Sequence, residues 1–205
     1  MSPIKRILFD LDGTLFDTQC FHGEAEAALL AEYGVLMHPD ELAERFAGIP
    51  TEIIFMTVLG CDEKTAHALA VRKWPAVFSR VKEAAQLHDL VSLFARILDR
   101  GVALSIGTGS PTQWARDLLH ENDLTNFFTS RAVIGVDLVT RGKPHPDIWL
   151  MAAQGTPSEN CLVVEDGIAG IQGAIAAGMR CALLLPREYP TAMRIKKLDD
   201  ILALL

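Results

Sequence analysis

Two aspartates separated by one residue follow a short apolar segment near the start of the chain, in the sequence Asp10-Leu11-Asp12-Gly13. On an extended chain, side chains two residues apart project to the same side, so the two carboxylates are expected to leave the end of a strand together. Gly13 then allows a sharp turn. Two adjacent carboxylates repel each other, and a hard cation such as Mg²⁺ removes that repulsion. The pair therefore indicates a magnesium site, although a bare D-x-D pattern fits an acidic turn equally well.

A hydroxyl group follows a second apolar segment, in the sequence Gly107-Thr108-Gly109-Ser110. A hydroxyl and free backbone N–H groups at the end of a strand can hold phosphoryl oxygens. The two glycines also begin the dinucleotide-binding pattern G-x-G-x-x-G, but Thr112 replaces its third glycine. The segment thus favours a phosphate contact at Thr108 and Gly109 over a nicotinamide cofactor.

Two prolines stiffen the chain around a lysine, in the sequence Lys143-Pro144-His145-Pro146. A fixed ammonium group is useful where negative charge builds up on a phosphoryl group. For a single Lys-Pro pair, a solvated lysine in a proline turn is the alternative. We interpret His145, between the prolines, as structural.

Glu165 and Asp166 end a further apolar segment and precede a helical pattern rich in small residues. Acidic side chains at the carboxyl ends of parallel strands face the crevice where open α/β sheets bind ligands. One of the two could instead stabilise the amino terminus of the following helix through its dipole. We expect the other to belong to the site.

Short aliphatic segments alternate with helical patterns along most of the chain, which predicts an α/β fold with a parallel sheet covered by helices on both faces. The predicted strands are 4–9, 103–107, 132–135, 162–165 and 182–185. The predicted helices are 87–100, 112–121, 146–154 and 167–177. Gly101, Gly155 and Gly178 follow three of them, where a left-handed helix end favours glycine.

Residues 17–86 interrupt this alternation, because they show only helical patterns punctuated by glycine and proline. An apolar stripe predicts a first helix over 18–33, and a long helix is predicted from Glu63 to about Lys82. The sequence therefore predicts a core domain formed by 1–16 and 87–205, with an all-helical domain, 17–86, inserted into it.

The composition argues against several classes of protein. The 205 residues carry a formal net charge of −7, whereas nucleic-acid binding requires a basic face. A membrane-spanning helix needs an apolar run of about 18 residues, and no run in this sequence is close to that length. The four scattered cysteines form no C-x-x-C pair and no secretory signal precedes them, so we expect reduced thiols in a soluble cytoplasmic protein. An anionic substrate would require a metal ion or a locally positive pocket.

The four polar segments together resemble the haloacid dehalogenase-like superfamily, in the branch with a helical cap inserted after the first strand. Their order and spacing also match, and the resemblance covers nearly the whole chain. Asp10 and Asp12 match the D-x-D-G-T motif, Thr108 the second-motif hydroxyl, Lys143 the third-motif lysine, and Glu165 with Asp166 the acidic fourth motif. The resemblance implies a Rossmann-like core, a mobile cap and magnesium.

The resemblance also implies a covalent mechanism on small phosphate esters. Asp10 would attack phosphorus to form an aspartyl-phosphate. Asp12 would protonate the leaving alcohol and later deprotonate the attacking water. Gly13, Thr108, Gly109 and Lys143 would bind the phosphoryl group, although many relatives carry Asn or Ser at the position of Gly109.

The metal ligands implied by the resemblance are Asp10, the backbone carbonyl of Asp12, and Asp166. Glu165 would be either a ligand or a partner of a ligand. The helical cap would close over the substrate and exclude bulk water.

Three alternatives share parts of this pattern. A haloacid dehalogenase does not need an acid at the position of Asp12, so that residue favours phosphate chemistry. A non-catalytic protein would be expected to lose a motif carboxylate, and all of them are kept. A phosphosugar mutase of the β-phosphoglucomutase type shares every core motif and also His22, and it is the main rival.

The segment 46–52 distinguishes the phosphatase prediction from the mutase alternative. In β-phosphoglucomutase-like relatives, an arginine three residues after the glycine grips the far phosphate of a bisphosphate intermediate. Here Thr51 stands three residues after Gly48, and the loss of a bidentate phosphate clamp favours release and hydrolysis. An ordinary turn with Pro50 at a helix start is the alternative for this segment. We therefore predict a magnesium-dependent phosphatase for small phosphate monoesters, with sugar phosphates as the leading class.

Overall fold

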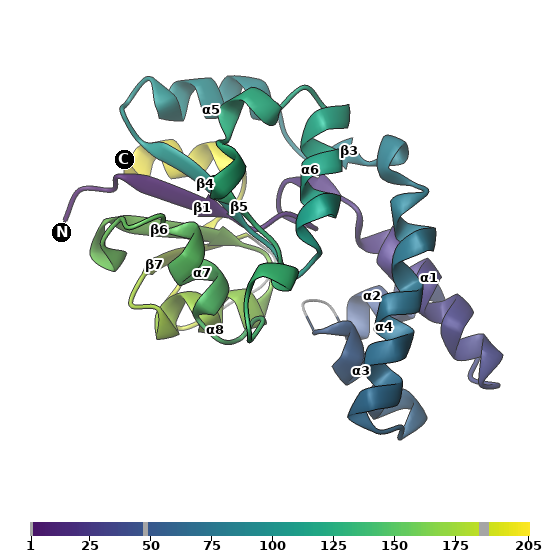
Figure 1. Ribbon diagram of the computed structural model, residues 1–205. Helices are drawn as coiled ribbons and strands as arrows, with labels where there is room; N and C mark the ends of the chain where they lie inside the picture. The colour runs from purple at the N-terminus through teal and green to yellow at the C-terminus, as the bar shows by residue number, and fades with distance from the viewer. Residues whose placement is uncertain (1, 47–48, 185–188) are drawn as a thin grey trace. The chain divides into compact units, whose positions relative to one another are not determined.

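A six-stranded sheet with all strands parallel forms the centre of the computed structural model, which describes residues 2–46, 49–184 and 189–205. The strand order is β5-β4-β1-β6-β7-β8 (Figure 1). The strands are β1 (Arg6–Phe9), β4 (Ala103–Gly107), β5 (Val133–Ile134), β6 (Cys161–Glu165), β7 (Arg180–Leu184) and β8 (Met193–Ile195).

β1 lies in the middle of the sheet because its residues are apolar on both faces, and Ile7, Leu8 and Phe9 are fully buried. Phe9 pairs with Ile106 of β4 on one side and with Val164 of β6 on the other. The three central strands therefore end at nearly the same level. The residues that follow them meet at one edge of the sheet, where open α/β folds bind ligands.

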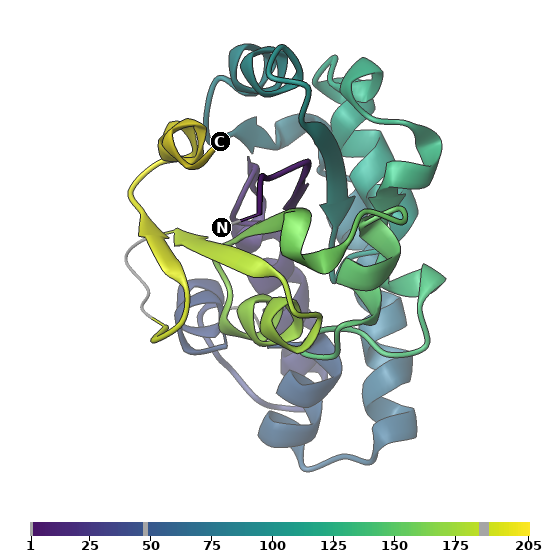
Figure 2. The same cartoon turned by 90° about the vertical axis from the view of Figure 1, so that its left-hand side faces the viewer.

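Helices cover both faces of the sheet, as the two views show (Figures 1 and 2). On one face lie α5 (Leu90–Leu98) and the carboxyl-terminal 3₁₀ helix η6 (Leu198–Leu204), which contact each other. On the opposite face lie α7 (Asp147–Ala152) and α8 (Ile168–Ala176), whose apolar residues share a core with Leu8 and Val163. α6 (Thr112–Glu121) packs against β5. The predicted α/β architecture is confirmed.

The helix ends follow the glycine pattern. Gly101, Gly155 and Gly178 all adopt positive φ angles, of 73°, 78° and 71°. The predicted helix start at residue 87 is wrong, because Leu87 donates its backbone N–H to Leu15 and α5 begins only after Asp89. The Asp89 side chain accepts a hydrogen bond from the Ser92 N–H, as an N-cap does.

The chain divides into two compact units, residues 1–16 with 86–205 and residues 17–85, here called the core unit and the helical unit. The two connections between them, β2 (Phe16–Asp17) and β3 (Ala85–Gln86), pair as a two-stranded sheet. The helical unit contains α1 (Gln19–Glu32), α2 (Pro39–Arg45), α3 (Thr51–Leu59), α4 (Glu63–Phe78) and the short η1 (Val81–Glu83).

The helical unit has its own apolar core, which includes Leu30, Leu42 and Phe55. α4 ends at Phe78, before the predicted end near residue 82, and the hydroxyl of its C-cap Ser79 donates to the Ala76 carbonyl. Within the described parts of the chain, no helix is both long enough and apolar enough to span a bilayer.

Candidate active site

Asp10, Lys143 and Glu165 form a buried ionic group at the carboxyl edge of the sheet. The Lys143 Nζ atom lies 2.5 Å from Asp10 Oδ1 and 2.6 Å from Glu165 Oε1. Asp10 and Glu165 are only 6% and 2% exposed. The ring of Trp149 lies beside the ammonium, with its centroid 4.4 Å from Nζ. The structure therefore brings the first, third and fourth predicted motifs into direct contact.

Burial and neighbouring charges shift the pKa values of the three residues in this group. It raises the pKa of Asp10 to about 7, with a contribution from the negative charge of Glu165. It also raises the pKa of Glu165. Burial alone would lower the pKa of Lys143, but the charges of Asp10 and Glu165 outweigh it, so the net effect is a raised pKa. Lys143 is therefore protonated near neutral pH, whereas burial disfavours the ionised form of Asp10, which additional positive charge would stabilise.

Both carboxylate oxygens of Glu165 are engaged by neighbouring groups. Oε1 accepts from Lys143, and Oε2 accepts from the backbone N–H of Gly167 at 2.6 Å. A Cβ atom at Gly170 would lie 1.6 Å from Oε1, so the helix α8 can pass the carboxylate only with glycine at that position. The sequence showed that α8 is rich in small residues, and the structure shows that one of them, Gly170, makes room for Glu165.

Asp10, Glu165 and Asp166 can each present an oxygen such that the three atoms lie within 4.8 Å of one another. The Thr14 hydroxyl donates to Asp166 Oδ1 at 3.3 Å. When ionised, the three carboxylates carry more negative charge than the Lys143 ammonium balances, and carboxylate oxygens are the ligands that Mg²⁺ prefers. The donor set therefore fits a hard divalent cation.

Asp12 turns toward the second motif and the first turn of α6. Its Oδ2 atom accepts from Ser110 at 2.6 Å and from the Thr108 hydroxyl at 3.4 Å. Its Oδ1 atom accepts from the indole N–H of Trp114 at 2.9 Å. The first and second motifs are thus joined by hydrogen bonds between Thr108, Ser110 and Asp12. Sequence reasoning missed Trp114, although its place in the first turn of a helix that starts at the strand edge was a usable signal.

The two glycines of the predicted phosphate site differ in their geometry. Gly13 has a φ angle of 86°, in the left-handed region that favours glycine, and its backbone N–H bonds to the Phe16 carbonyl at 2.8 Å. A Cβ atom at Gly109 would meet no other atom within 4 Å. Gly13 is therefore required by the backbone turn, whereas at Gly109 the structure leaves room for a larger group.

His22 and Thr51 lie in the helical unit and have partners there. The His22 ring meets the ring of Trp74 edge to face, at a centroid distance of 5.5 Å. The Thr51 hydroxyl donates to Glu26 Oε1 at 2.8 Å, and Lys73 Nζ lies 2.5 Å from Thr51 Oγ1 and 3.0 Å from the same Glu26 oxygen. Of the predicted loop, residues 47 and 48 lie outside the described part of the chain.

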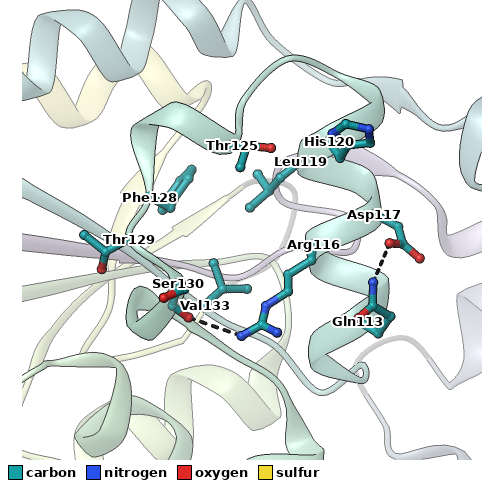
Figure 3. A pocket seen from close by; sticks show the side chains of 10 residues that line it. All are labelled: Gln113, Arg116, Asp117, Leu119, His120, Thr125, Phe128, Thr129, Ser130 and Val133. Atoms are coloured by element: carbon teal, nitrogen blue, oxygen red, sulfur yellow. Dashed lines mark hydrogen bonds between the residues drawn. The ribbon is translucent and has the colours of Figure 1, made fainter.

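A surface pocket on the core unit is lined by one side of α6 and by residues 125–133, which follow it (Figure 3). Within it, Gln113 donates to Asp117 at 2.6 Å and Arg116 donates to the Ser130 carbonyl at 3.3 Å. Asp10, Asp12 and Lys143 do not line this pocket, so it is distinct from the candidate site.

Comparisons with known proteins identify the family of the chain. The model of the family described as haloacid dehalogenase-like hydrolase matches residues 7–184. The fructose-1-phosphate phosphatase of Escherichia coli (strain K12) is 34% identical over 177 residues, which are 84% of this chain and 92% of that protein. The 6-phosphogluconate phosphatase of the same strain is 30% identical over 189 residues, which are 87% of this chain and 81% of that protein.

Among solved structures, the β-phosphoglucomutase from Clostridium difficile superposes with a TM-score of 0.79 at 22% identity, over 97% of this chain and 93% of that one. At this identity the likeness shows the fold. The family model covers most of the chain, and the sequence relatives are phosphatases. The chain belongs to the haloacid dehalogenase-like hydrolase family and is a phosphatase of that family.

Proposed function

We propose that this phosphatase hydrolyses small phosphate monoesters, with sugar phosphates as the leading class, through an aspartyl-phosphate at Asp10 and with Mg²⁺ as cofactor. The observation that carries the proposal is the contact of Lys143 with both Asp10 and Glu165, beside Asp166. The names of the two sequence relatives, which act on fructose 1-phosphate and 6-phosphogluconate, favour the sugar-phosphate class. Four free cysteines fit action in a reducing cytoplasm.

In the first step, a carboxylate oxygen of Asp10 attacks phosphorus while the bond from phosphorus to the ester oxygen breaks. Asp12 gives its proton to that ester oxygen, so that an alcohol leaves. In the second step, water attacks phosphorus, Asp12 takes a proton from the water, and the bond from phosphorus to the Asp10 oxygen breaks. Inorganic phosphate leaves and both aspartates return to their starting states.

Lys143 and Thr108 would stabilise the equatorial phosphoryl oxygens, together with the backbone at Gly13 and Gly109. When bound, Mg²⁺ would neutralise charge on the phosphoryl group and on the carboxylates. Asp10, the backbone carbonyl of Asp12, and Asp166 would hold it.

We assign Glu165 the task of orienting Lys143 rather than that of a ligand. Its two oxygens already bind the Lys143 ammonium and the Gly167 N–H. A carboxylate held at both oxygens keeps a single orientation and fixes the ammonium beside Asp10.

The contacts of Thr51 support hydrolysis over phosphate migration. A mutase must hold a second phosphoryl group while the sugar turns, which favours an arginine clamp. Lys73, the cation beside Thr51, is already paired with the buried carboxylate of Glu26. We propose that the helical unit acts as the cap that selects the alcohol part of the substrate, with His22 and Thr51 among its contacts.

The test is release of inorganic phosphate from a panel of phosphomonoesters, with Mg²⁺ and with the metal removed by a chelator. The proposal expects magnesium-dependent release, highest with sugar phosphates, and none from Asp10→Ala. A parallel assay supplies β-glucose 1-phosphate with a trace of the 1,6-bisphosphate. Faster formation of glucose 6-phosphate than of free phosphate would overturn the phosphatase assignment in favour of a mutase.

A further inference from the structure

Trp114 is a fully buried residue whose indole N–H points at a motif carboxylate. Its Nε1 atom lies 2.9 Å from Asp12 Oδ1, while Ser110 Oγ lies 2.6 Å from Asp12 Oδ2. A donor on each oxygen fixes both the direction and the plane of the carboxyl group. An indole N–H is a donor only and has a fixed direction, whereas a hydroxyl rotates, so the indole specifies the position of its acceptor.

The start of α6 is itself fixed, so Trp114 cannot easily move away from Asp12. Thr112 donates to Asp137 Oδ1 through its backbone N–H at 2.6 Å and through its hydroxyl at 2.8 Å. The Thr112 hydroxyl in turn accepts from the backbone N–H of Gly135 at 3.1 Å. These bonds tie the first turn of the helix to the chain that follows β5.

The side of α6 seen in Figure 3 lines the surface pocket and carries Gln113, Arg116, Asp117 and His120. Trp114 is not among those residues, and it lies in the protein interior with Ala115 and Leu118. α6 thus presents one side to the pocket and uses the indole of its first turn to reach Asp12.

We propose that Trp114 is a positioning residue, which holds the Asp12 carboxyl group where it can pass a proton to the leaving-group oxygen. This inference rests on the proposed role of Asp12 as general acid. Trp114 does not touch the reacting atoms in this account, and it acts through the orientation of Asp12.

A positioning role for proton donation predicts a dependence on the leaving group. Departure of an alkoxide from a sugar phosphate needs a proton, whereas departure of p-nitrophenolate hardly does. A misplaced Asp12 should therefore reduce kcat/KM for a sugar phosphate and spare it for p-nitrophenyl phosphate. A general loss of packing would reduce both values by the same factor.

The experiment measures kcat/KM of wild type and Trp114→Phe with the best sugar phosphate of the panel and with p-nitrophenyl phosphate. Phenylalanine keeps an aromatic ring and removes the N–H donor. We expect the ratio of the two kcat/KM values to shift against the sugar phosphate by about tenfold or more, as for loss of a hydrogen bond to a charged group. Ser110→Ala, which removes the donor to the other oxygen, should shift the ratio in the same direction and keeps the test valid if Trp114→Phe folds poorly.

Three further variants serve as references for this ratio. Asp12→Asn should give the largest shift, and adding Trp114→Phe to it should shift the ratio no further. Leu118→Ala, a buried residue of the same helix, should lower the melting temperature and leave the ratio unchanged.

The outcomes distinguish a failure of the positioning role of Trp114 from a failure of the proposed mechanism. If Asp12→Asn shifts the ratio but Trp114→Phe and Ser110→Ala reduce both substrates equally, the positioning role is overturned and the phosphatase mechanism stands. If Asp12→Asn itself causes no shift, Asp12 is not the general acid, and the proposed mechanism fails together with the role of Trp114.

Discussion

The Lys143 ammonium holds together two carboxylates that burial would otherwise make unfavourable in their charged forms. It is enclosed by the sheet edge and by the Trp149 ring, so little water can replace it. A buried ionic group of this kind contributes little net stability as a whole, but the loss of one partner leaves an uncompensated charge. Single residues of the site should therefore affect stability as well as catalysis.

Lys143→Met tests this at the residue scale. In the presence of a chelator, we expect the free energy of unfolding to fall by about 3–5 kcal/mol, because Asp10 and Glu165 lose their shared cation. Urea denaturation followed by circular dichroism measures the change. Lys5→Met, at an exposed position of the same unit, is the control and should stay within about 0.5 kcal/mol of wild type. Equal stabilities of the two variants would show that Lys143 is not an essential part of the buried group.

Asp166→Ala tests the metal site without reference to activity. Mg²⁺ that binds the folded protein should raise the melting temperature of wild type, and removal of a ligand should weaken that rise. We expect Asp166→Ala to need at least about tenfold more Mg²⁺ for the same increase. Glu159→Ala removes an exposed carboxylate of the same unit and should respond like wild type. An unchanged magnesium response in Asp166→Ala would place the ion elsewhere.

At the scale of elements, α8 and α6 orient the functional side chains that lie at the ends of the strands. The strand ends deliver Asp10, Thr108 and Glu165 to one edge of the sheet, and the helices that follow decide how these side chains are oriented. α8 passes so close to Glu165 that its third residue must be Gly170. The geometry of the site thus depends on helix residues that carry no reactive group.

Gly170→Ala should show this dependence. The added methyl group would overlap Glu165 Oε1, so the carboxylate and the Lys143 ammonium must shift. We expect kcat/KM to fall by about 100-fold, as for a displacement of catalytic groups by about 1 Å. Gln172→Ala, on the exposed side of the same helix, controls for the change in helix propensity. Wild-type activity in Gly170→Ala would mean that Glu165 does not orient Lys143.

The central strands and the motif residues beside them could be predicted from the sequence, because β1, β4 and β6 are mostly apolar and polar residues stand at or just after their carboxyl ends. β8 could not be predicted in this way, because Met193–Ile195 lies at the edge of the sheet and contributes only one buried residue. Trp114 and Gly170 escaped prediction for a different reason. Their roles depend on contacts with residues that are distant in the sequence, and the local sequence pattern does not indicate such contacts.

At the scale of the whole molecule, the fold alone does not choose between hydrolysis and phosphate migration, because a β-phosphoglucomutase has the same architecture. The overall charge of −7 does not attract phosphate esters either. Binding must therefore come from the cations of the site, namely Lys143 and the proposed Mg²⁺. The two compact units divide the task in our proposal, with phosphoryl chemistry in the core unit and choice of the alcohol in the helical unit.

The central claim is covalent phosphorylation of Asp10, and rapid-quench mixing with a ³²P-labelled sugar phosphate tests it most directly. In the presence of Mg²⁺, we expect transient label on the protein that maps to the peptide containing Asp10 and disappears as labelled phosphate is released. Asp10→Asn, with a normal circular dichroism melt, should give no label and less than about 1% of wild-type turnover. Label on another residue, or full turnover by Asp10→Asn, would contradict the account.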